Sequence, residues 1–382
     1  MTITKLDPKT NIKPDPKRRN LLKGGAVAAA GAAMAGFSAP AISKNTIKWD
    51  MVTTWPRNLP GLGTGAQYFA DMVTQVSGGD FTITLHPAGE IVPAFESIDA
   101  VGNGTVQCGH GAPYYWKGKA PATQFLSNMP FGLTAQEYNA WYYYGGGKEL
   151  ADKVYREQLG CKFLPCGNTG VQHPGWSTKE VKSLADFKGL KMRMPGIAAE
   201  AMKQLGAVVV NTPGSEVTAA LASGTVDWVE WNNPHGEASL AFYRFAKYYY
   251  TPGFHEPGTV LELFINSKAW DGLSKANQLL IEQCAAATNV KMLSEFVWYS
   301  GPQLQEFVSK HGTLVRAIDD KSLVAIGNEI GKIIGNIISS DKYSREVYAS
   351  MMKARAFQIP YSNTTEVEFM RARSLPYVYP KV

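Results

Sequence analysis

The sequence lacks the residue patterns that usually identify a metalloprotein or a hydrolase. No two of its six histidines are spaced as H-x-H or H-x-x-x-H, and no C-x-x-C pair occurs, so a zinc site has little support. The G-x-S-x-G turn that presents a nucleophilic serine is also absent. The four cysteines, Cys108, Cys161, Cys166 and Cys284, are too scattered for a dense disulfide scaffold. An oxidising compartment would permit a Cys161–Cys166 bridge, and plain buried thiols are the alternative.

Charged residues and long hydrophobic runs are also scarce. Only 18% of the 382 residues are charged and 45% are hydrophobic, which excludes a disordered chain and predicts a packed core. The weakly hydrophobic stretch Gly24–Phe37 is about 14 residues long, shorter than the roughly 20 that a membrane span needs. The length predicts two or three domains.

The basic excess lies at one end of the chain. The formal net charge is +6, and residues 1–41 contribute +5 of it through seven basic and two acidic residues. The other 341 residues therefore carry only +1, with no long run of lysine or arginine. Such a chain has no electrostatic reason to hold a polyphosphate, so we expect no nucleic-acid partner.

The first 41 residues have the layout of an export signal. A basic segment ends in KRRNLLK at residues 17–23, the Gly24–Phe37 stretch follows, and the small-x-small sequence APA stands at 39–41. Paired arginines followed by two leucines resemble the twin-arginine signal. We therefore expect residues 1–41 to be a signal peptide and the protein to reach the periplasm already folded.

The remaining sequence predicts two successive α/β units. Strand and helix patterns alternate over residues 47–109 and again over 189–231, which indicates mostly parallel sheets covered by helices. In the second unit, Ser215 is the expected N-cap of a helix over 215–223. A strand at Val260–Ile265 would return to the first sheet, and the chain beyond residue 275 is mainly helical.

The expected fold class is therefore α/β with two lobes. Residues 45–165 together with about 255–310 would form the N-terminal lobe, residues 166–254 the C-terminal lobe, and residues 311–382 a set of C-terminal helices. Two lobes predict a cleft between them, because ligands bind at domain interfaces and at the carboxyl ends of parallel strands. Hinge closure is the motion that this layout permits.

One motif points to a different function. The sequence GLGTGA at residues 61–66 matches a dinucleotide-binding fingerprint, so an exported dinucleotide-dependent oxidoreductase is an alternative. Against it, seven residues that include two prolines separate the motif from the preceding strand. The acidic residue that should follow about 20 positions later is also ambiguous.

Arg193 and Glu230 are the strongest candidates for a binding site. Arg193 ends an apolar strand just before a Pro-Gly pair, where a guanidinium can hold a carboxylate through two charge-assisted hydrogen bonds. Glu230 ends another apolar strand, and a buried glutamate needs a cation or a donor. An internal ion pair between the two is one interpretation. The other is a hard-cation site made of the Glu230 carboxylate, the Trp231 carbonyl and an amide oxygen such as that of Gln172.

At these residues the sequence resembles the solute-binding proteins of TRAP transporters, the tripartite ATP-independent periplasmic systems. The likeness extends over residues 45–370, and LKMRMPG at 190–196 is its most specific segment. The segments TTWP at 53–56, GHGAPYYW at 109–116 and GFHEPG at 253–258 resemble a subgroup that binds 2-oxo acids or lactate together with a metal ion. The resemblance implies a two-lobed periplasmic binding protein fold with a long C-terminal helix packing across both lobes, and no enzymatic activity.

The resemblance also implies roles for individual residues. Arg193 would grip the carboxylate of the substrate. Gln172, Glu230 and Trp231 would hold one cation, Na⁺ or Ca²⁺, which also contacts the ligand. Three tryptophans are expected as apolar walls around a short alkyl tail: Trp55, Trp116 and Trp231.

Three further residues complete the expected site. Tyr115 and Asn168 would donate hydrogen bonds to the ligand, and Glu256 would line the same cleft. Charge counting then separates the two cations. Arg193, Glu230 and the ligand carboxylate sum to −1, which Na⁺ neutralises, whereas inclusion of Glu256 gives −2, which Ca²⁺ neutralises.

The sequence thus predicts a periplasmic receptor that captures a small 2-oxo monocarboxylate such as pyruvate, or lactate, and delivers it to a membrane permease. The alternatives are the oxidoreductase above and a receptor of the same fold for a longer acid or a dicarboxylate. The resemblance allows a homodimer through the helices of residues 311–382 without requiring one.

Overall fold

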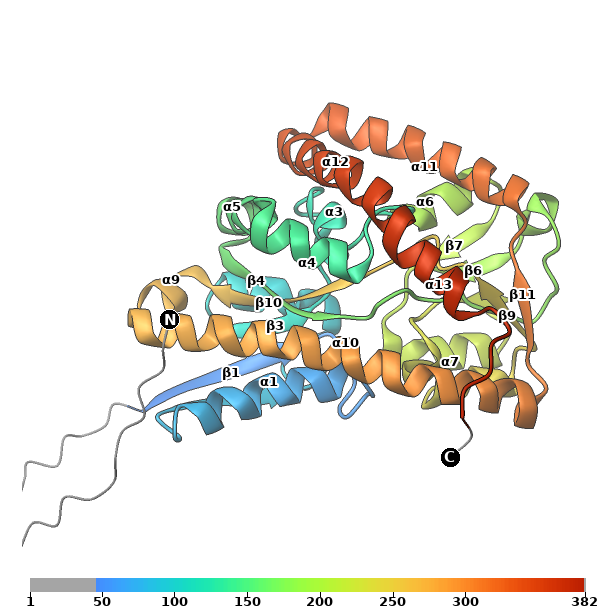
Figure 1. Cartoon of the computed structure of the whole chain (residues 1–382). Coiled ribbons are helices and arrows are strands. Elements are labelled where there is room, and N and C mark those ends of the chain that lie inside the picture. The colour runs from blue at the N-terminus through green and yellow to red at the C-terminus, as the bar shows by residue number, and fades with distance from the viewer. Residues whose placement is uncertain (1–45, 381–382) are drawn as a thin grey trace, which may run out of the picture. The chain divides into compact units, whose positions relative to one another are not determined.

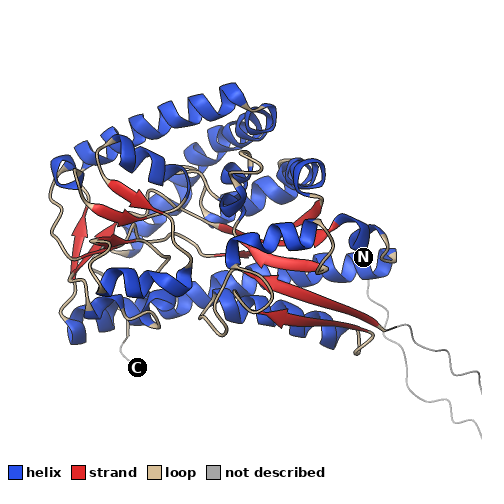
Figure 2. Ribbon diagram, turned by 180° about the vertical axis from the view of Figure 1, so that it is seen from behind, coloured by secondary structure: helices blue, strands red, loops and turns tan. Residues whose placement is uncertain are grey.

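The computed structural model describes residues 46–380, so the expected signal peptide at residues 1–41 lies outside the described residues. The described part contains two β-sheets, each surrounded by helices and each forming the centre of one lobe (Figures 1 and 2). None of the helices within residues 46–380 combines the length and the apolar character needed to cross a membrane.

The first lobe is built on a five-stranded sheet of order β2-β1-β3-β10-β4. Its strands are β1 (Ile47–Thr53), β2 (Phe81–His86), β3 (Cys108–Gly111), β4 (Cys161–Asn168) and β10 (Val260–Asn266). β1 pairs in parallel with β2 and β3, whereas β10 runs antiparallel to β3 and β4. As expected, the strand after residue 260 returns to this sheet, where it lies between β3 and β4.

The helices of the first lobe follow from apolar periodicity and capping. α1 (Leu62–Val76) buries Phe69 and Val73. Thr134 and Glu137 form a reciprocal capping box at the start of α4, which satisfies two backbone N–H groups at that end. The other helical elements here are η2 (Ala94–Glu96), α2 (Ser97–Gly102), η3 (Pro113–Trp116), α3 (Thr123–Ser127), α4 (Ala135–Tyr144), α5 (Gly147–Leu159) and α9 (Ser267–Asp271).

The second lobe contains a six-stranded sheet of order β11-β9-β5-β8-β6-β7. Its strands are β5 (Trp176–Ser177), β6 (Lys191–Arg193), β7 (Val208–Val210), β8 (Trp228–Val229), β9 (Tyr248–Thr251) and β11 (Leu314–Ala317). The sequence pattern does not predict β5, β9 or β11. β11 falls in the range 311–382, for which we expected only helices.

The helices of the second lobe begin where proline and glycine permit a sharp change of direction. They are η4 (Leu184–Phe187), α6 (Gly196–Gln204), α7 (Gly214–Ala222), α8 (Pro234–Ala238) and η5 (Phe242–Arg244). Ser215 is not the N-cap that we expected, because α7 begins one residue earlier, after the extended Pro213, and Ser215 lies within its first turn.

Up to residue 311, the chain crosses between the lobes three times. Residues 169–175 lead from β4 into the second lobe, and residues 252–259 lead back from β9 to β10. The third crossing is α10 (Lys275–His311), a helix of 37 residues that packs on α1 and β4 of the first lobe and on α8 of the second (Figure 1). It is the long C-terminal helix across both lobes that the resemblance implies.

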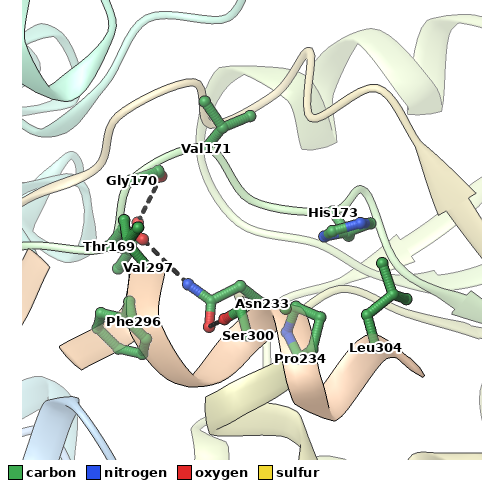
Figure 3. Close-up of a pocket in the computed structure, with 11 residues that line it drawn as sticks. Thr169, Gly170, Val171, His173, Asn233, Pro234, Phe296, Val297, Ser300 and Leu304 are labelled. Carbon is green, nitrogen blue, oxygen red and sulfur yellow. Dashed lines mark hydrogen bonds between the residues drawn. The ribbon is translucent and has the colours of Figure 1, made fainter. Parts of the chain in front are cut away.

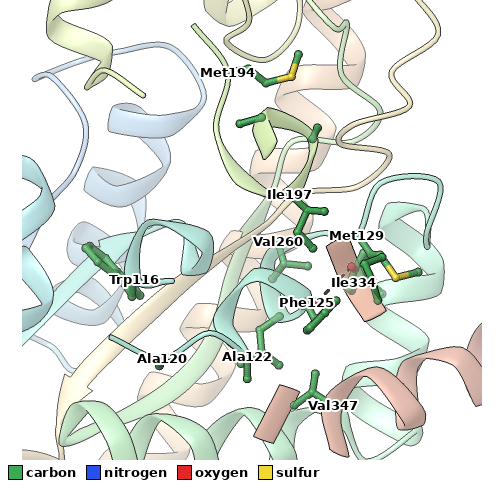
Figure 4. Close-up of a cluster of buried hydrophobic side chains, with 14 of the residues drawn as sticks. Trp116, Ala120, Ala122, Phe125, Met129, Met194, Ile197, Val260, Ile334 and Val347 are labelled. Carbon is green, nitrogen blue, oxygen red and sulfur yellow. Dashed lines mark hydrogen bonds between the residues drawn. The ribbon is translucent and has the colours of Figure 1, made fainter. Parts of the chain in front are cut away.

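Two further helices also tie the lobes together. α11 (Asp320–Ser340) packs on α6 of the second lobe, and α12 (Lys342–Ser362) packs on α3, α4 and α5 of the first. A buried hydrophobic cluster beneath them joins Phe125 of α3, Ile197 of α6 and Ile334 of α11 (Figure 4). The chain continues through a π-helical turn (Asn363–Val367) into α13 (Glu368–Arg373).

The four cysteines are buried and free in the described part of the chain. Cys161 and Cys166 both belong to β4. Extended backbone separates residues five apart by about 16 Å, well beyond disulfide reach. The alternative of plain buried thiols therefore holds in this structure.

Candidate functional site

The candidate site lies where the two connecting segments, residues 169–175 and 252–259, run side by side between the lobes. The Gln172 N–H donates to the Glu256 carbonyl over 3.1 Å. A third segment, residues 230–233 after β8, joins them through its own backbone and side chains. Four of the nine residues that the sequence predicts for the site come from these three segments: Gln172, Glu230, Trp231 and Glu256.

Arg193 enters the same region from the end of β6 and is only 1% exposed. Its Nη1 donates to the Glu230 carboxylate and to the Glu230 carbonyl, both over 2.6 Å, and its Nε donates to the Thr212 carbonyl over 3.2 Å. The guanidinium also lies 5.1 Å from the ring centroid of Trp231. Nη2 has no hydrogen-bond partner among residues 46–380. The internal ion pair therefore forms, and one edge of the guanidinium is still free to bind an anion.

Glu230, His255 and Glu256 form a buried cluster. Each offers a potential ligand atom, and these atoms all lie within 4.8 Å of one another. Burial lowers the pKa of His255 to about 4, so this imidazole is neutral near pH 7. Burial raises the pKa of Glu230 to about 8, against the effect of Arg193. Burial and the Glu230 charge raise the pKa of Glu256 to about 7. The cluster is short of positive charge, and a cation would stabilise both carboxylates.

Gln172 presents an unused acceptor to this cluster. Its Nε2 donates to the Glu256 carboxylate over 2.6 Å and lies within hydrogen-bond distance of the hydroxyls of Thr169 and Thr259. These three acceptors fix which end of the amide is nitrogen. Oε1 then has no partner in the described structure, although it is buried. A buried amide oxygen without a donor, next to two carboxylates, fits the oxygen ligands that a hard cation prefers.

A small pocket with a cavity volume of about 10 Å³ lies beside these groups. Its lining residues are Trp55, Leu62, Tyr114, Tyr115, Thr169, Gln172, Trp231, Asn232, Thr259 and Leu261. The Trp55 indole N–H donates to His110, so Trp55 offers only its apolar ring to the pocket. The Trp231 ring lies so close to Gly214 that a Cβ there would be 2.1 Å from it. Glycine at 214 therefore allows the Trp231 ring to take this position.

Five of the predicted residues are not in the lining of this pocket: Arg193, Glu230, Glu256, Trp116 and Asn168. The first three are the charged groups described above, and the other two have different partners. The Trp116 indole donates to Glu262 over 2.5 Å, and its ring packs on Phe264 in the core, so Trp116 is not a wall of the pocket. Asn168 accepts from the Gly170 N–H over 2.8 Å and donates to the Gly258 carbonyl over 3.3 Å. Because both ends of its amide are engaged, Asn168 here joins the two connecting segments to each other.

Three residues of the site are missing from the sequence prediction. His255 belongs to the buried cluster, Asn232 lines the pocket with an amide nitrogen that lacks a partner within residues 46–380, and Thr259 lines it beside Gln172. The segment 253–258 is a signal for His255, because it carries the adjacent Glu256. Asn232 and Thr259 are common loop residues, and nothing in their spacing distinguishes them.

The dinucleotide alternative is not favoured by the environment of the glycine motif. A Cβ on Gly61 would lie 2.2 Å from the Phe296 ring, and one on Gly65 would lie 2.2 Å from Met292, both on α10. The Gly61 N–H donates to the Glu295 carboxylate over 3.0 Å. The glycines therefore allow α10 to pack closely on α1, and a carboxylate of the protein already occupies the start of this helix, where a pyrophosphate would bind.

A second, open cavity of about 180 Å³ borders the same connecting segment (Figure 3). Thr169, Gly170, Val171 and His173 form one side of it, Asn233 and Pro234 at the start of α8 another, and α10 the third. Thr169 lines both cavities. The segment that carries Gln172 is thus reached by side chains of α8 and α10.

Two α/β lobes with a small, buried, charged pocket at their connections define a solute-binding protein. Residues 51–341 match the family described as DctP, bacterial extracellular solute-binding protein, family 7, and the chain belongs to this family of TRAP-type periplasmic receptors. The family consists of binding proteins, so the chain is not an enzyme.

Comparison with individual proteins gives the same class. The chain is 35% identical, over 92% of its length and 98% of the other, to a protein of Nostoc sp. called monocarboxylate 2-oxoacid-binding periplasmic protein. A TRAP solute-binding protein from Colwellia psychrerythraea, solved with bound calcium and pyruvate, is 35% identical with a TM-score of 0.82, covering 86% of this chain and 99% of that one.

Two more solved structures are similarly close. A TRAP solute-binding protein from Pseudoalteromonas atlantica, solved with bound sodium and pyruvate, is 34% identical with a TM-score of 0.82, covering 85% of this chain and 99% of that one. One from Bordetella bronchiseptica is a mixed-occupancy dimer with calcium and picolinate in one site and an apo site. It is 31% identical with a TM-score of 0.83, covering 86% and 97% of the two chains.

Proposed function

We propose that this protein is the receptor of a TRAP transporter for a small 2-oxo monocarboxylate such as pyruvate, or for lactate, and that it binds this ligand together with one cation. The observation that carries the proposal is the set of buried polar atoms without partners, within residues 46–380, around one small pocket: Arg193 Nη2, Trp231 Nε1, Asn232 Nδ2 and Gln172 Oε1. Buried polar groups are rarely left unpaired, so several in one place indicate an absent ligand.

Two groups would recognise the ligand: the Arg193 guanidinium and the bound cation. Arg193 would donate from Nη2 to the ligand carboxylate, while its Nη1 stays on Glu230. Gln172 Oε1, the Glu230 carboxylate and the Trp231 carbonyl would hold the cation, with Glu256 and His255 beside them. The cation, when bound, supplies positive charge next to the oxo or hydroxyl oxygen and one carboxylate oxygen of the ligand. Tyr115, Trp231 and Asn232 line the pocket and would donate the remaining hydrogen bonds.

The charge of the site favours Ca²⁺ over Na⁺. Glu256 lies within the same 4.8 Å cluster as Glu230, and His255 is neutral. With both carboxylates ionised, as a bound cation would keep them, Arg193 and the ligand carboxylate bring the net charge of the site to −2. Elemental analysis of protein purified without chelator tests this, and we expect one calcium ion per protein. Ligand binding that requires sodium, in protein that contains no calcium, would contradict it.

The pocket favours a short, apolar tail on the ligand. Its apolar lining comes from Trp55, Leu62 and Leu261, and Trp55 has no free polar atom there. A second carboxylate would lose its hydration in this lining without a counter-charge. This supports a monocarboxylate over the dicarboxylate alternative.

We extend the proposal to the organisation of the chain. Residues 45–165 with about 255–310, residues 166–254, and residues 311–382 would act as N-terminal lobe, C-terminal lobe and C-terminal helices, with the last as a dimer element. The ligand would bridge the lobes, stabilise their closure and be delivered to the permease. Export by the twin-arginine route through residues 1–41 belongs to the same proposal.

A thermal-shift screen tests the ligand class. Pyruvate, 2-oxobutyrate, lactate and succinate are each added to the full protein with 1 mM calcium, and with EDTA as the control. We expect pyruvate or a close homologue to raise the melting temperature in calcium only, because a ligand that binds the native state stabilises it. A shift with succinate alone, or shifts that EDTA leaves unchanged, would contradict the proposal.

A further inference from the structure

A chain of hydrogen bonds links α10 to the segment that carries Gln172 (Figure 3). The Ser300 hydroxyl on α10 donates to the Asn233 Oδ1 over 3.2 Å. The Asn233 Nδ2 donates to the Thr169 carbonyl over 3.0 Å. Asn233 is 3% exposed and its bond to Thr169 is buried, whereas its bond to Ser300 is part-buried at the edge of the open cavity.

The partners of Ser300 fix the orientation of the Asn233 amide. The Ser300 oxygen also accepts from the His235 backbone N–H over 3.4 Å, which leaves the hydroxyl proton available for Asn233. The carbonyl end of the Asn233 amide must then face Ser300, and the NH₂ end must face Thr169. A reversed amide would place two acceptors, its own oxygen and the Thr169 carbonyl, against each other.

Thr169 passes this constraint to Gln172. The Thr169 hydroxyl donates to the Gly170 carbonyl over 3.0 Å and accepts from Gln172 Nε2 over 2.9 Å. Asn233 lies in the same segment as the candidate cation ligands Glu230 and Trp231. Its bond to Thr169 therefore connects that segment to the one that carries Gln172, the other candidate ligand. The separation between those segments determines whether one cation can be held by both.

The helix that supplies Ser300 is itself fixed in both lobes. Glu295, five residues earlier on α10, accepts from the Gly61 N–H of the first lobe over 3.0 Å. It also lies 3.0 Å from His235 Nε2 in the second lobe. Ser300 is therefore presented from a part of α10 that contacts both lobes.

We propose that Asn233 and Ser300 are positioning residues for the cation: together they set the place of Gln172 relative to Glu230 and Glu256. This inference rests on the proposed function, because it needs Gln172 to be a cation ligand. Neither Asn233 nor Ser300 lines the ligand pocket itself. Partners of metal ligands in the surrounding structure commonly affect metal affinity when they are removed.

The test compares Ser300→Ala with Ser300→Thr, which keeps the hydroxyl. Calcium affinity is measured by calorimetry on the full, calcium-free protein without any organic ligand. We expect Ser300→Ala to weaken calcium binding about tenfold, at the lower end of the usual effect of such partners, and Ser300→Thr to retain most of the affinity. Ser309→Ala is the matched control, because that hydroxyl bonds only within α10. It should leave the affinity unchanged.

A second readout does not involve the loaded protein. Hydrogen exchange of the backbone amides of residues 169–173 in calcium-free protein should be faster in Ser300→Ala than in Ser300→Thr or Ser309→Ala. Asn233→Ala should weaken calcium binding and speed up exchange more than Ser300→Ala does. If Asn233→Ala does not fold, the comparison of Ser300→Ala with Ser300→Thr still tests the proposal. Calcium affinity and exchange in Ser300→Ala equal to those of the unmodified protein would overturn the proposal.

The failure of the underlying function has a different result. Gln172→Leu removes the amide oxygen itself, and it should abolish calcium binding. If Gln172→Leu keeps the full calcium affinity, the cation site is elsewhere and both proposals fail. If Gln172→Leu loses calcium and Ser300→Ala does not, the cation site stands and the positioning role alone is wrong.

Discussion

At the scale of single residues, Arg193 already binds a carboxylate of the protein, that of Glu230, and it would bind the ligand carboxylate in addition. Two of its three guanidinium nitrogens bond to Glu230 and Thr212, and the third is free. The sequence offers an ion pair and a ligand site as alternatives, and the geometry accommodates both. A substitution at Arg193 therefore removes a ligand contact and also leaves Glu230 without its partner.

The first prediction separates these two effects. Arg193→Ala should abolish ligand binding and also lower the free energy of unfolding by roughly 3–5 kcal/mol, because it strands a buried carboxylate. The double variant Arg193→Ala/Glu230→Gln should recover much of the stability and none of the binding. Urea denaturation and calorimetry measure the two quantities. Near-native ligand affinity in either variant would refute the role of Arg193.

Glu262 is another buried acid, next to the pocket residue Leu261 in β10. It is 0% exposed and accepts from the Trp116 indole. Burial raises its pKa to about 8, and the Trp116 hydrogen bond only partly opposes this. The carboxyl is therefore protonated in the folded protein at a pH where it is ionised in the unfolded chain.

The second prediction follows from the direction of this shift. The folded state binds the proton more tightly, so the contribution of Glu262 to stability is complete below about pH 4.5 and is lost as the pH rises to about 8. The loss amounts to roughly 4–5 kcal/mol. Glu262→Gln should remove this part of the pH dependence and raise the melting temperature at pH 8.5. Glu306→Gln, at a partly exposed position, is the control, and equal pH profiles for all three proteins would count against the argument.

For single residues, the sequence predicts which side chains need a polar partner better than it predicts where each side chain points. Arg193, Glu230 and Gln172 stand out because a charge or amide at the end of an apolar strand needs a partner. Trp116 and Asn168 do not behave as expected, because their side-chain directions depend on a short η3 turn and on a neighbouring segment 90 residues away in the chain. Those partners are set by the tertiary fold, which no local pattern contains.

At the scale of elements, the contact between α1 and α10 depends on glycine. Gly61 has φ of +75° and faces the Phe296 ring, whereas Gly65 faces the flexible end of Met292. A methyl group at either position would meet α10. The two sites differ in how easily the neighbour can move and in backbone strain.

The third prediction compares the two positions. Gly61→Ala should lower the free energy of unfolding by roughly 2–4 kcal/mol, because it combines a left-handed backbone with an overpacked aromatic ring. Gly65→Ala should cost about 1 kcal/mol, because the methionine side chain adapts. Urea denaturation of both variants measures the difference. A larger cost for Gly65→Ala would mean that Met292 cannot move.

Long elements are predicted from the sequence and short ones are not. β1 and α1 lie within residues 47–109, where we expected alternating strands and helices, because seven and fifteen residues give a clear period. β5, with two residues, and β11, with four, carry too few residues for a period to be visible. These strands form because β9 lies between them and supplies the hydrogen bonds.

At the scale of the whole described unit, one ion pair spans the two lobes away from the connecting segments. Lys117 follows η3 in the first lobe, Glu200 belongs to α6 in the second, and their charged atoms are 3.2 Å apart. Both side chains are about one-third exposed. The pair forms only when the lobes are close together, so it should favour the closed state slightly.

The fourth prediction concerns the rate of ligand release. Lys117→Ala should raise the dissociation rate about two- to fivefold, since an exposed pair contributes at most about 1 kcal/mol. Lys117→Glu/Glu200→Lys should restore the slow rate, and high salt should reduce the difference. Stopped-flow fluorescence measures it. Arg156→Ala is the control, because its partner Asp271 lies in the same lobe. An equal effect in that variant would exclude a specific role for the interlobe pair.

The position of β10 has a consequence for the order in which the protein is built. β4 joins the first sheet only through β10, which the ribosome completes at residue 266, after all of residues 176–251. Those residues already contain five adjacent strands of the second sheet, from β9 to β7. We therefore expect hydrogen exchange on ribosome-bound chains that expose residues only up to about 255 to show protection in β5–β9 and none in β4, and protection of β4 in those chains would contradict this. The sheet that begins the chain is thus completed only after five strands of the other have been made, and β11 is added to that other sheet later still.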